Sequence, residues 1–443
     1  MYKKTIRIIL TFTLFFCFMQ INMTTYAANS DTYFTVDNVK YKKLSNSTVA
    51  VWDASSVEGD YSIPSKVNYN DSNYSVTQIG YKAFYGNEKL TGVVMPDSIT
   101  KIQDGKDEDW IYYGAFEKCT NLKSVTFSKN LTYIGKFAFS GDEVLENVTI
   151  PNKVKNIMDE AFNDCKGITK LTLPTATTYV GQCAFYGTSL VTFTIPKTCE
   201  DFHFLTLDGI PTLTDICVED GHSSYTSLNG IMYSSDMSTL ECYPQGKKNT
   251  QYKLPKSVKI LNMGVLAGNK YIKELVMNSV IDERGLGPAV IQDTNISTIK
   301  VSADNPYMKS VDGVLFSKNG DTLLLYPPAK KDEMYFVPSG TKHIGNGLAY
   351  TFEACQYLEE LYVPASVETM TGTMWRSKKL KQVVFASEGN LTSIDSAMFQ
   401  DCTALQSICF PKSIKYLSKE YYGNEFLDCY SLETLCGWRS RYL

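Results

Sequence analysis

Carboxylate side chains gather at one place in this 443-residue chain, in the segment Asp-Gly-Lys-Asp-Glu-Asp-Trp at 104–110. Asp104, Asp107, Glu108 and Asp109 supply the kind of oxygen atoms that a calcium ion prefers. Their spacing does not match the D-x-D-x-D-G calcium loop, so the segment more simply predicts a solvated loop and no metal site. The residues Asp107, Glu108, Asp109 and Trp110 remain candidates for a loop that contacts a partner, because insertions in repeat proteins tend to fall on one face.

Few other side chains in the sequence are suited to catalysis. The chain has three histidines, which are His203, His222 and His343. His343 holds a position that Tyr133 and Tyr179 hold elsewhere, which is typical of a surface residue in a repeat. No H-E-x-x-H, G-x-S-x-G or phosphate-binding glycine loop is present. The sequence therefore predicts a protein that is not an enzyme and that carries no cofactor.

The chain contains twelve cysteines, and their positions in the repeat are more informative than their number. Five of them occupy one recurrent slot, ahead of the segment L-x-x-V-x-I: Cys119, Cys165, Cys355, Cys402 and Cys429. A slot of this kind predicts buried, reduced thiols that act as small apolar side chains. No C-x-x-C pair supports zinc. An alternative exists in the last two units, where Cys402 and Cys409 recur as Cys429 and Cys436, because stacked strands about 5 Å apart approach disulfide distance.

The cysteine slot and His343 belong to a repeated unit, for which the stretch YIGKFAFSGDEVLENVTIPNKV at 133–154 is an example. The steps from Ser128 to Pro151, Pro174 and Pro196 are 23, 23 and 22 residues. A period in the low twenties is typical of leucine-rich repeats, in which each unit is one strand and one helical or irregular segment.

The apolar residues within a unit indicate how the units stack. Val148 and Ile150 alternate as in a strand, whereas Ala138 and Phe139 have the spacing of a short helical turn. One unit cannot bury these groups alone, but stacked units can. The proline ends each strand because it has no N–H for a parallel ladder. We therefore expect a repeat solenoid with a parallel β-strand ladder and short helical or irregular segments.

Two further segments, near 225–255 and 307–338, interrupt this period and are copies of each other. Asn229 and Asp312 are equivalent positions, 83 residues apart. Each copy has alternating strands around a turn, and Asn319-Gly320 is a strong hairpin signal. The pattern predicts two β-hairpin insertions in the solenoid.

The phrases IGKFAF, AFEKCTNLKSVTF, VTIPNKV and DGVLFSKNGDTLLLYP are similar to those of the BspA-type leucine-rich repeat proteins. The resemblance extends from about residue 76 to the C-terminus. It implies an exported protein of a bacterial surface and an association with adhesion to host proteins or other cells. The shared residues are structural, so the resemblance transfers no binding or catalytic residue.

The first residues predict export. A basic start with Lys3, Lys4 and Arg7 precedes an apolar core at 8–19, which is shorter than the roughly 20 residues that span a membrane. We expect a signal peptide at 1–27, cleaved after Ala27 or Ala28, and a mature chain without a membrane span that is secreted or held at the cell surface. Residues 28–75 predict an N-terminal β cap, and 76–443 the solenoid.

The outward residues of the strand ladder form the main candidate ligand face. They are Val94, Thr126, Thr149, Thr172, Thr194, Cys217, Val276, Lys300, Tyr362, Val384, Cys409 and Cys436. These residue types also have high β-propensity, so the column has a purely structural interpretation as well. As a ligand face, its candidates are Thr126, Thr149, Thr172, Thr194, Lys300 and Tyr362. Charged residues flank it: Lys123, Glu146, Lys170, Glu359, Glu360 and Lys381.

The balance of charge narrows the class of partner. The formal net charge is -4 and no Lys/Arg-rich run is present, so nucleic acid is not expected. A long sheet face suits an extracellular protein or a glycan polymer. The sequence thus predicts a non-catalytic binding protein in adhesion or host interaction. The alternative is a structural component of the cell envelope, or the recognition part of a larger surface assembly.

Overall fold

The computed structural model describes residues 32–108, 111–278, 280–347, 350–371, 374–394, 397–415, 417 and 426–437. The predicted signal peptide, and Asp109 and Trp110 of the predicted contact loop, lie outside these residues. The chain divides into two compact units. Unit 1 comprises Met1–Ser189 and Thr198–Leu207, and unit 2 comprises Leu190–Lys197 and Asp208–Leu443.

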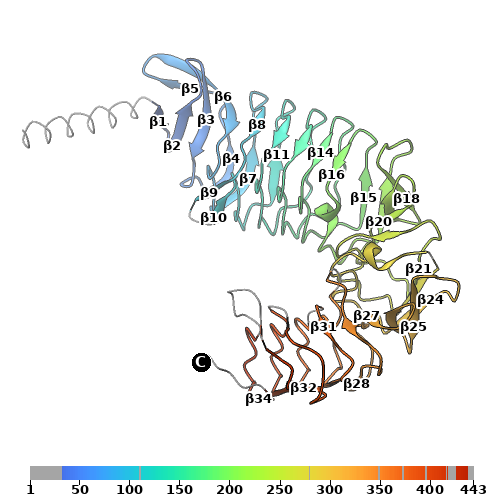
Figure 1. The fold of residues 1–443 in the computed structure, drawn as a ribbon. Helices are drawn as coiled ribbons and strands as arrows, with labels where there is room; N and C mark the ends of the chain where they lie inside the picture. The colour runs from blue at the N-terminus through green and yellow to red at the C-terminus, as the bar shows by residue number, and fades with distance from the viewer. Residues whose placement is uncertain are drawn as a thin grey trace, which may run out of the picture. The chain divides into compact units, whose positions relative to one another are not determined.

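Unit 1 is a coil with two ladders of parallel strands, which Figure 1 shows in blue to green. The first ladder joins β3 (Thr48–Asp53), β6 (Ser72–Ile79), β8 (Lys101–Ile102), β12 (Tyr133–Ile134), β13 (Asn156–Ile157), β14 (Tyr179–Val180) and β16 (Asp201–Phe202). The second ladder joins β4 (Gly59–Ser62), β7 (Leu90–Val94) and β11 (Ser124–Thr126). Three antiparallel strands extend the sheet of the first ladder. β1 (Tyr33–Val36) and β2 (Val39–Lys43) precede β3, and β5 (Lys66–Tyr69) pairs with β6.

The parallel pairing begins within the segment that the sequence predicts as a cap. β3 is in parallel register with β6, and β4 is in parallel register with β7. The antiparallel strands β1 and β2 cover the outer edge of β3. The cap therefore contributes its own strands to both ladders, although the boundary at residue 75 remains a prediction.

The segment expected to be a helical turn is a series of tight turns. Phe137 and Glu160, each just before the buried Ala-Phe pair, have φ of 57° and 54°. A left-handed residue interrupts an α-helix. Instead the amides of Phe137 and Phe139 donate to the carbonyls of Asp159 and Ala161 in the next coil. These bonds between coils replace the bonds that a helix would make within itself.

The aromatic residue of each turn stacks on its equivalent in the next coil. Centroid distances along the column Phe84, Phe116, Phe139, Phe162 and Phe185 are 4.6, 5.0, 5.2 and 5.7 Å, and all five rings are fully buried. Burying one such side chain contributes roughly 1.5–3 kcal/mol. The continuous core that the repeat predicts is therefore present.

The predicted cysteine slot lies inside this core. The thiols of Cys119 and Cys165 donate to the carbonyls of Phe84 and Phe139, each at 3.0 Å, and the cysteines are unpaired. Burial raises the pKa of both thiols. Cysteine suits the slot because it is small and has one weak donor for a carbonyl that faces it.

Glycine in the turn is required by the neighbouring coil. A Cβ on Gly135 would lie 2.1 Å from the carbonyl oxygen of Gln103. The crowding that excludes a Cβ at Gly135 thus comes from the neighbouring coil.

Unit 2 continues the same design, with five sheets among its described residues, shown in Figure 1 from green to red. Three are parallel: β15 (Thr192–Ile195) with β17 (Asp215–Val218); β21 (Gln251–Lys253), β23 (Glu274–Met277) and β24 (Thr298–Val301); and β28 (Met334–Phe336), β30 (Glu360–Val363), β32 (Gln382–Phe385), β33 (Ser407–Cys409) and β34 (Thr434–Cys436). The helices in the described residues are two short 3-10 turns, η1 (Phe204–Leu207) in unit 1 and η2 (Glu283–Gly285) in unit 2.

The other two sheets confirm the hairpin insertions. One contains β18 (Tyr225–Leu228), β19 (Ile231–Ser234), β20 (Thr239–Cys242) and β22 (Ile260–Leu261). The other contains β25 (Met308–Val311), β26 (Val314–Ser317), β27 (Thr322–Leu325), β29 (His343–Ile344) and β31 (Thr369–Met370). In each module the first turn has two residues with positive φ, Asn229-Gly230 and Asp312-Gly313, which matches the geometry of type I′ hairpins.

Candidate functional site

The predicted ligand face is irregular in unit 1. Thr126, Thr149 and Thr172 are exposed as expected, and Thr126 pairs with Val94 through β11 and β7. Asn147 adopts a left-handed conformation, with φ of 54°, in the segment that carries Thr149. Thr149 and Thr172 lie outside the ladder strands, so the regular register ends after Thr126.

Hollows separate these coils on the outer face. One of about 390 Å³ lies between residues 147–152 and 170–174, and another of about 660 Å³ lies between 125–129 and 147–153. The exposed lining is mainly Thr149, Thr172, Asn147 and Lys170. This part of the face offers hydroxyl, amide and ammonium groups beside apolar surface.

Two further predicted residues lie in unit 2 on separate sheets. Thr194 on β15 is exposed and lies opposite Cys217 on β17. Lys300 on β24 lies opposite Val276 and forms an ion pair with Glu274 at 2.6 Å. That ion pair ties Lys300 to its neighbouring strand.

The face is most regular, and most apolar, on the last sheet of unit 2. Tyr362 on β30 lies between Phe336 on β28 and Val384 on β32. The rings of Phe336 and Tyr362 stack, with centroids 4.5 Å apart and planes 10° apart. Phe336 is 62% exposed and Met334, on the same strand, is 54% exposed. These two residues were not predicted from the sequence, because their strand β28 follows the hairpin insertion, where the repeat period is interrupted.

Charged groups flank this apolar column as predicted. Lys381 and Glu359 form an ion pair at 2.7 Å. Glu360 accepts a hydrogen bond from the Tyr362 hydroxyl, which raises the pKa of that hydroxyl. The bond fixes the ring of Tyr362 beside Phe336, so the two aromatic side chains form a preorganised surface.

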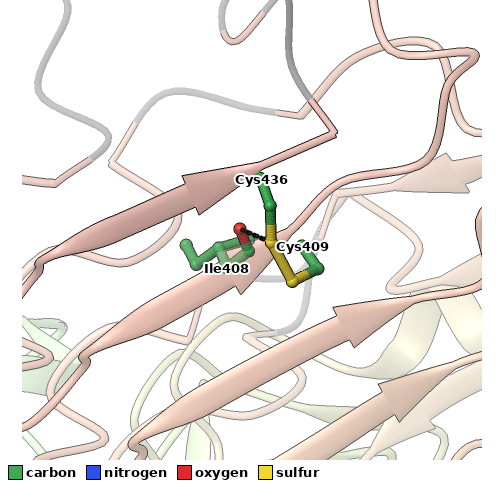
Figure 2. The surroundings of a disulfide bond; sticks show 3 residues. All are labelled: Ile408, Cys409 and Cys436. Carbon is green, nitrogen blue, oxygen red and sulfur yellow. Dashed lines mark hydrogen bonds between the residues drawn. A yellow bond between two sulfur atoms is a disulfide. The ribbon is translucent and has the colours of Figure 1, made fainter.

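A disulfide ends the same column. Figure 2 shows Cys409 on β33 and Cys436 on β34 joined across neighbouring strands, with Cα atoms 4.5 Å apart. The sulfur of Cys436 lies 3.5 Å from the Ile408 carbonyl oxygen. The disulfide alternative for the last two units is therefore present at this pair, and the interpretation as reduced thiols does not extend to it. Cys402 and Cys429 are free, as are Cys119, Cys165, Cys217, Cys242 and Cys355.

The predicted contact loop begins as a hairpin. β9 (Lys106–Glu108) pairs with β10 (Ile111–Tyr113), and Asp107 lies opposite Tyr112. The segment is a pair of strands whose residues Lys106 and Asp107 are exposed, which agrees with the predicted solvated segment. Asp104 does not join the other carboxylates in a site, because it accepts hydrogen bonds from the Tyr133 hydroxyl at 2.7 Å and from the amide of Lys136. As a contact surface, the hairpin remains a prediction.

The histidines take part in separate local contacts. The Nδ1 atom of His222 accepts the amide of Ser224 at 3.1 Å, and that of His343 lies 2.8 Å from the Thr369 hydroxyl oxygen. His203 accepts the amide of Leu205. Among the described residues, no group of three His, Cys, Asp or Glu side chains is arranged to hold a metal ion.

Two buried carboxyl groups were not anticipated from the sequence. Asp142 in unit 1 accepts the Cys119 amide at 2.8 Å, and burial raises its pKa well above the ordinary value. Glu353 in unit 2 is 4% exposed, and neither carboxyl oxygen has a hydrogen-bond partner among the described residues. Burial raises the pKa of Glu353 to about 7, although nearby Arg376 acts in the opposite direction. Both residues lie in turn segments, where no sequence signal distinguishes a buried acid from a surface one.

Comparison with known families accounts for the scaffold. The model of the BspA type leucine rich repeat region matches residues 61–107, 77–213 and 333–436, with six copies, and these stretches span more than half of the chain. The chain belongs to this family. Such proteins are typical of bacterial surfaces, and their repeats are generally not enzymatic. No curated protein sequence is significantly similar to this BspA-type chain.

Solved structures of bacterial leucine-rich repeat proteins are similar over most of its length. The pneumococcal vaccine antigen PcpA is 21% identical, with a TM-score of 0.52, over 91% of this chain and 98% of its own. A leucine rich cell surface protein of Faecalibacterium prausnitzii is 18% identical, with a TM-score of 0.47, over 92% of this chain and 95% of its own. At these identities the likeness concerns the fold alone. Within the described residues, no helix has the length and apolar character needed to cross a membrane.

Proposed function

We propose that this protein is an exported, non-catalytic adhesin-type binding protein of a bacterial surface. Its binding face for an extended protein partner is the last sheet of unit 2. The observation that carries the proposal is the outward row of Phe336, Tyr362 and Val384 on β28, β30 and β32. Phe336 is exposed, Tyr362 and Val384 are half-buried, and the exposed Met334 lies beside this row on β28.

The chemistry of the column favours a protein partner. Aromatic and methionine side chains are enriched at the centres of protein interfaces, whereas Lys and Glu are more common at their rims. Phe336 and Tyr362 provide a stacked aromatic centre, and Glu359 and Lys381 provide a charged rim. The partner's apolar side chains would cover Phe336 and Met334, which water contacts in the free protein.

The rigidity of this sheet also supports binding. Hydrogen-bonded parallel register holds Phe336, Tyr362, Val384 and Cys409 in one row, and the disulfide to Cys436 fixes the end of the row. A preordered surface loses less conformational entropy when it binds. The basic, apolar N-terminal segment and the family support export to the surface where such a partner is met.

The test measures binding of the purified mature chain to a panel of immobilised extracellular-matrix proteins. The double variant Phe336→Ala, Tyr362→Ala should weaken the binding of whichever matrix protein is recognised by about 30-fold, the effect of losing a typical interface hot spot of about 2 kcal/mol. The matched control is Thr126→Ala, Thr149→Ala, which alters equivalent outward positions in unit 1 and should leave affinity within about twofold.

Two results would contradict the proposal. One is an absence of binding to every member of the panel. The other is equal weakening by the two double variants, which would place binding elsewhere. Fractionation of the producing cells addresses the envelope alternative: a structural component stays with the cell wall whether or not Phe336 and Tyr362 are replaced.

A further inference from the structure

A second concave surface lies at the junction of the N-terminal cap and the first turn of unit 1. It is a hollow of about 230 Å³. The cap contributes Lys40 from β2 and Trp52 and Asp53 from β3, and the turn contributes Tyr81 and Tyr85. The hollow lies apart from the strand face, because its residues come from the first ladder and from the turns.

The aromatic side chains of this hollow are held by close packing. A Cβ on Gly80 would lie 2.8 Å from the Trp52 ring, so the indole rests directly on the Gly80 backbone. Tyr81 meets Trp52 edge to face, with centroids 5.1 Å apart and planes 87° apart. Tyr33 supports the indole from β1 at 5.5 Å. Trp52 is therefore part of a fixed aromatic wall.

A second aromatic pair extends the wall toward the hairpin β9–β10. Tyr85 packs edge to face on Tyr113, with centroids 4.8 Å apart. The ammonium group of Lys118 donates to the Tyr85 hydroxyl at 3.3 Å. Lys82, which also lines the hollow, places its ammonium group 3.8 Å from the centroid of the Tyr113 ring. The hairpin that the sequence suggested as a contact element thus supports this hollow through Tyr113.

Positive charge surrounds the aromatic wall. The ammonium groups of Lys42 and Lys106 lie 4.3 Å from the Trp52 ring centroid and 5.6 Å from the Tyr81 ring centroid. The ion pairs in the described part of unit 1 involve neither of them, nor Lys40. Their ammonium groups would attract an anionic group of a ligand.

The hollow also contains a hydrogen-bond acceptor, the carboxylate of Asp53. The Asp53 carboxylate accepts the amide of Ser55 at 3.1 Å and its hydroxyl at 2.7 Å, and both residues line the hollow. These bonds orient one carboxylate oxygen and leave the second able to accept from a ligand hydroxyl.

We infer that this hollow binds an acidic sugar residue of a polysaccharide. The C–H faces of a pyranose ring pack on aromatic rings such as Trp52 and Tyr85, and its hydroxyls donate to acceptors such as Asp53. The carboxylate or sulfate group of the sugar pairs with the ammonium group of Lys40. The volume is below the roughly 300–1,000 Å³ of pockets for drug-sized ligands, so it suits one ring of a chain that continues into solvent.

The test uses the full mature chain and immobilised polymers at about 0.15 M salt, where charges beyond roughly 8 Å are screened. Polygalacturonate presents carboxylates, dextran sulfate presents sulfates, and dextran is the neutral polymer. We expect binding to at least one of the two acidic polymers and none to dextran. The arm that binds identifies the anionic group.

Two variants test the two parts of the hollow. Tyr85→Ala removes an aromatic ring, and Lys40→Glu reverses the charge. Each should weaken binding of the acidic polymer by at least about tenfold, as for other hot-spot residues. The matched controls are Tyr186→Ala, the equivalent position in a later Ala-Phe-Tyr-Gly turn, and Lys155→Glu, an exposed lysine elsewhere in unit 1. Both controls should bind as the parent does.

Several outcomes would overturn the inference. They are a lack of binding to both acidic polymers, equal binding to dextran, or equal weakening by Lys155→Glu, which would indicate general charge attraction. An acidic polypeptide, poly-glutamate, serves as a competitor: displacement of the polymer that does not depend on Tyr85 would show that charge alone acts. Circular dichroism of each variant separates these outcomes from misfolding.

Discussion

The outward faces of units 1 and 2 have the same repeat positions but different surfaces. In unit 1 the column at Thr126, Thr149 and Thr172 is polar, and its register ends after β11. In the last sheet of unit 2 the column contains Phe336 and Tyr362, and five strands remain paired. A single scaffold thus carries two unlike surfaces. The repeat determines the direction in which a side chain points, but not which residue type occupies the position.

The interiors differ much less than the faces. Unit 1 stacks Phe139 on Phe162 at 5.2 Å, and unit 2 stacks Phe399 on Phe426 at 5.7 Å. In both units a cysteine thiol donates to a carbonyl of the turn, from Cys165 in one and from Cys402 in the other. Stability should therefore depend on the interior slots in both units, while binding depends on the outward slots.

The largest expected effect comes from an interior slot. Phe139→Ala leaves a cavity in the middle of the aromatic column and should lower the free energy of unfolding by about 3–5 kcal/mol. Phe336→Ala, which removes an exposed ring of equal size, should change it by no more than about 0.5 kcal/mol. Urea unfolding monitored by circular dichroism measures both, and similar losses for the two variants would break the distinction between interior and face.

The disulfide at the end of the unit 2 column should have the next largest effect. It closes a loop with a sequence separation of 27 residues. Loop-closure entropy alone gives a loss of about 3–4 kcal/mol when Cys409→Ser and Cys436→Ser are combined. Cys217→Ser is the control, because Cys217 occupies an outward strand position and is free. Unchanged unfolding of the double variant, or free thiols at both positions by mass spectrometry, would contradict this prediction.

The buried carboxyl group of Glu353 should make unfolding of unit 2 depend on pH. Burial raises its pKa from 4.5 to about 7. The folded chain therefore binds this proton more tightly than the unfolded chain. The contribution of this proton to the free energy of unfolding is full below about pH 4.5 and is lost as the pH rises through 7. A difference of this size corresponds to roughly 3 kcal/mol between pH 4.5 and 8.

Glu353→Gln, which stays neutral, isolates that contribution. Its free energy of unfolding should fall less between pH 4.5 and 8 than that of the parent chain, and urea unfolding at the two pH values measures the difference. An identical pH dependence in both proteins would mean that Glu353 does not bind its proton more tightly in the folded chain. Glu359→Gln, at a more exposed carboxylate paired with Lys381, serves as the control.

The smallest expected effect is that of Thr149→Phe, a variant that tests whether the outward face of unit 1 can acquire the binding proposed for the Phe336 face of unit 2. Thr149→Phe places an aromatic ring at an outward position of unit 1. We expect a change within about 0.5 kcal/mol in the free energy of unfolding, because the position is exposed. It should give no affinity for the matrix protein that the Phe336 face binds, since the paired strands beside it are absent. A gain of binding would show that one outward ring is sufficient.

Much of the fold was predictable because its signal is periodic. The spacing of Pro151 and Pro174, and the recurrent slot of Cys119 and Cys165, identified the coil and its interior. The candidate face was predictable in direction, since Thr126 is exposed as expected. Its interruption after β11 was not, because Asn147 is one of many polar residues and only its backbone conformation distinguishes it.

The hollow beside Trp52 could not be found from the sequence. Its residues come from the cap and from the first turn, about 30 residues apart, and the cap has no repeat pattern that places it against the turn. The pairing of Cys409 with Cys436 was visible as one of several alternatives. The choice depended on which cysteine faces outward on adjacent strands, and the register of β33 and β34 decided it.

The periodic interior follows from the amino-acid sequence, because apolar side chains at a fixed spacing can be buried only when successive units stack. Tertiary structure alone decided which polar and aromatic groups meet: Phe336 with Tyr362, Trp52 with Tyr81, and Glu353 with its buried surroundings. The physical reason is that these contacts depend on strand register and backbone conformation across separate segments, where the local sequence carries no repeating signal.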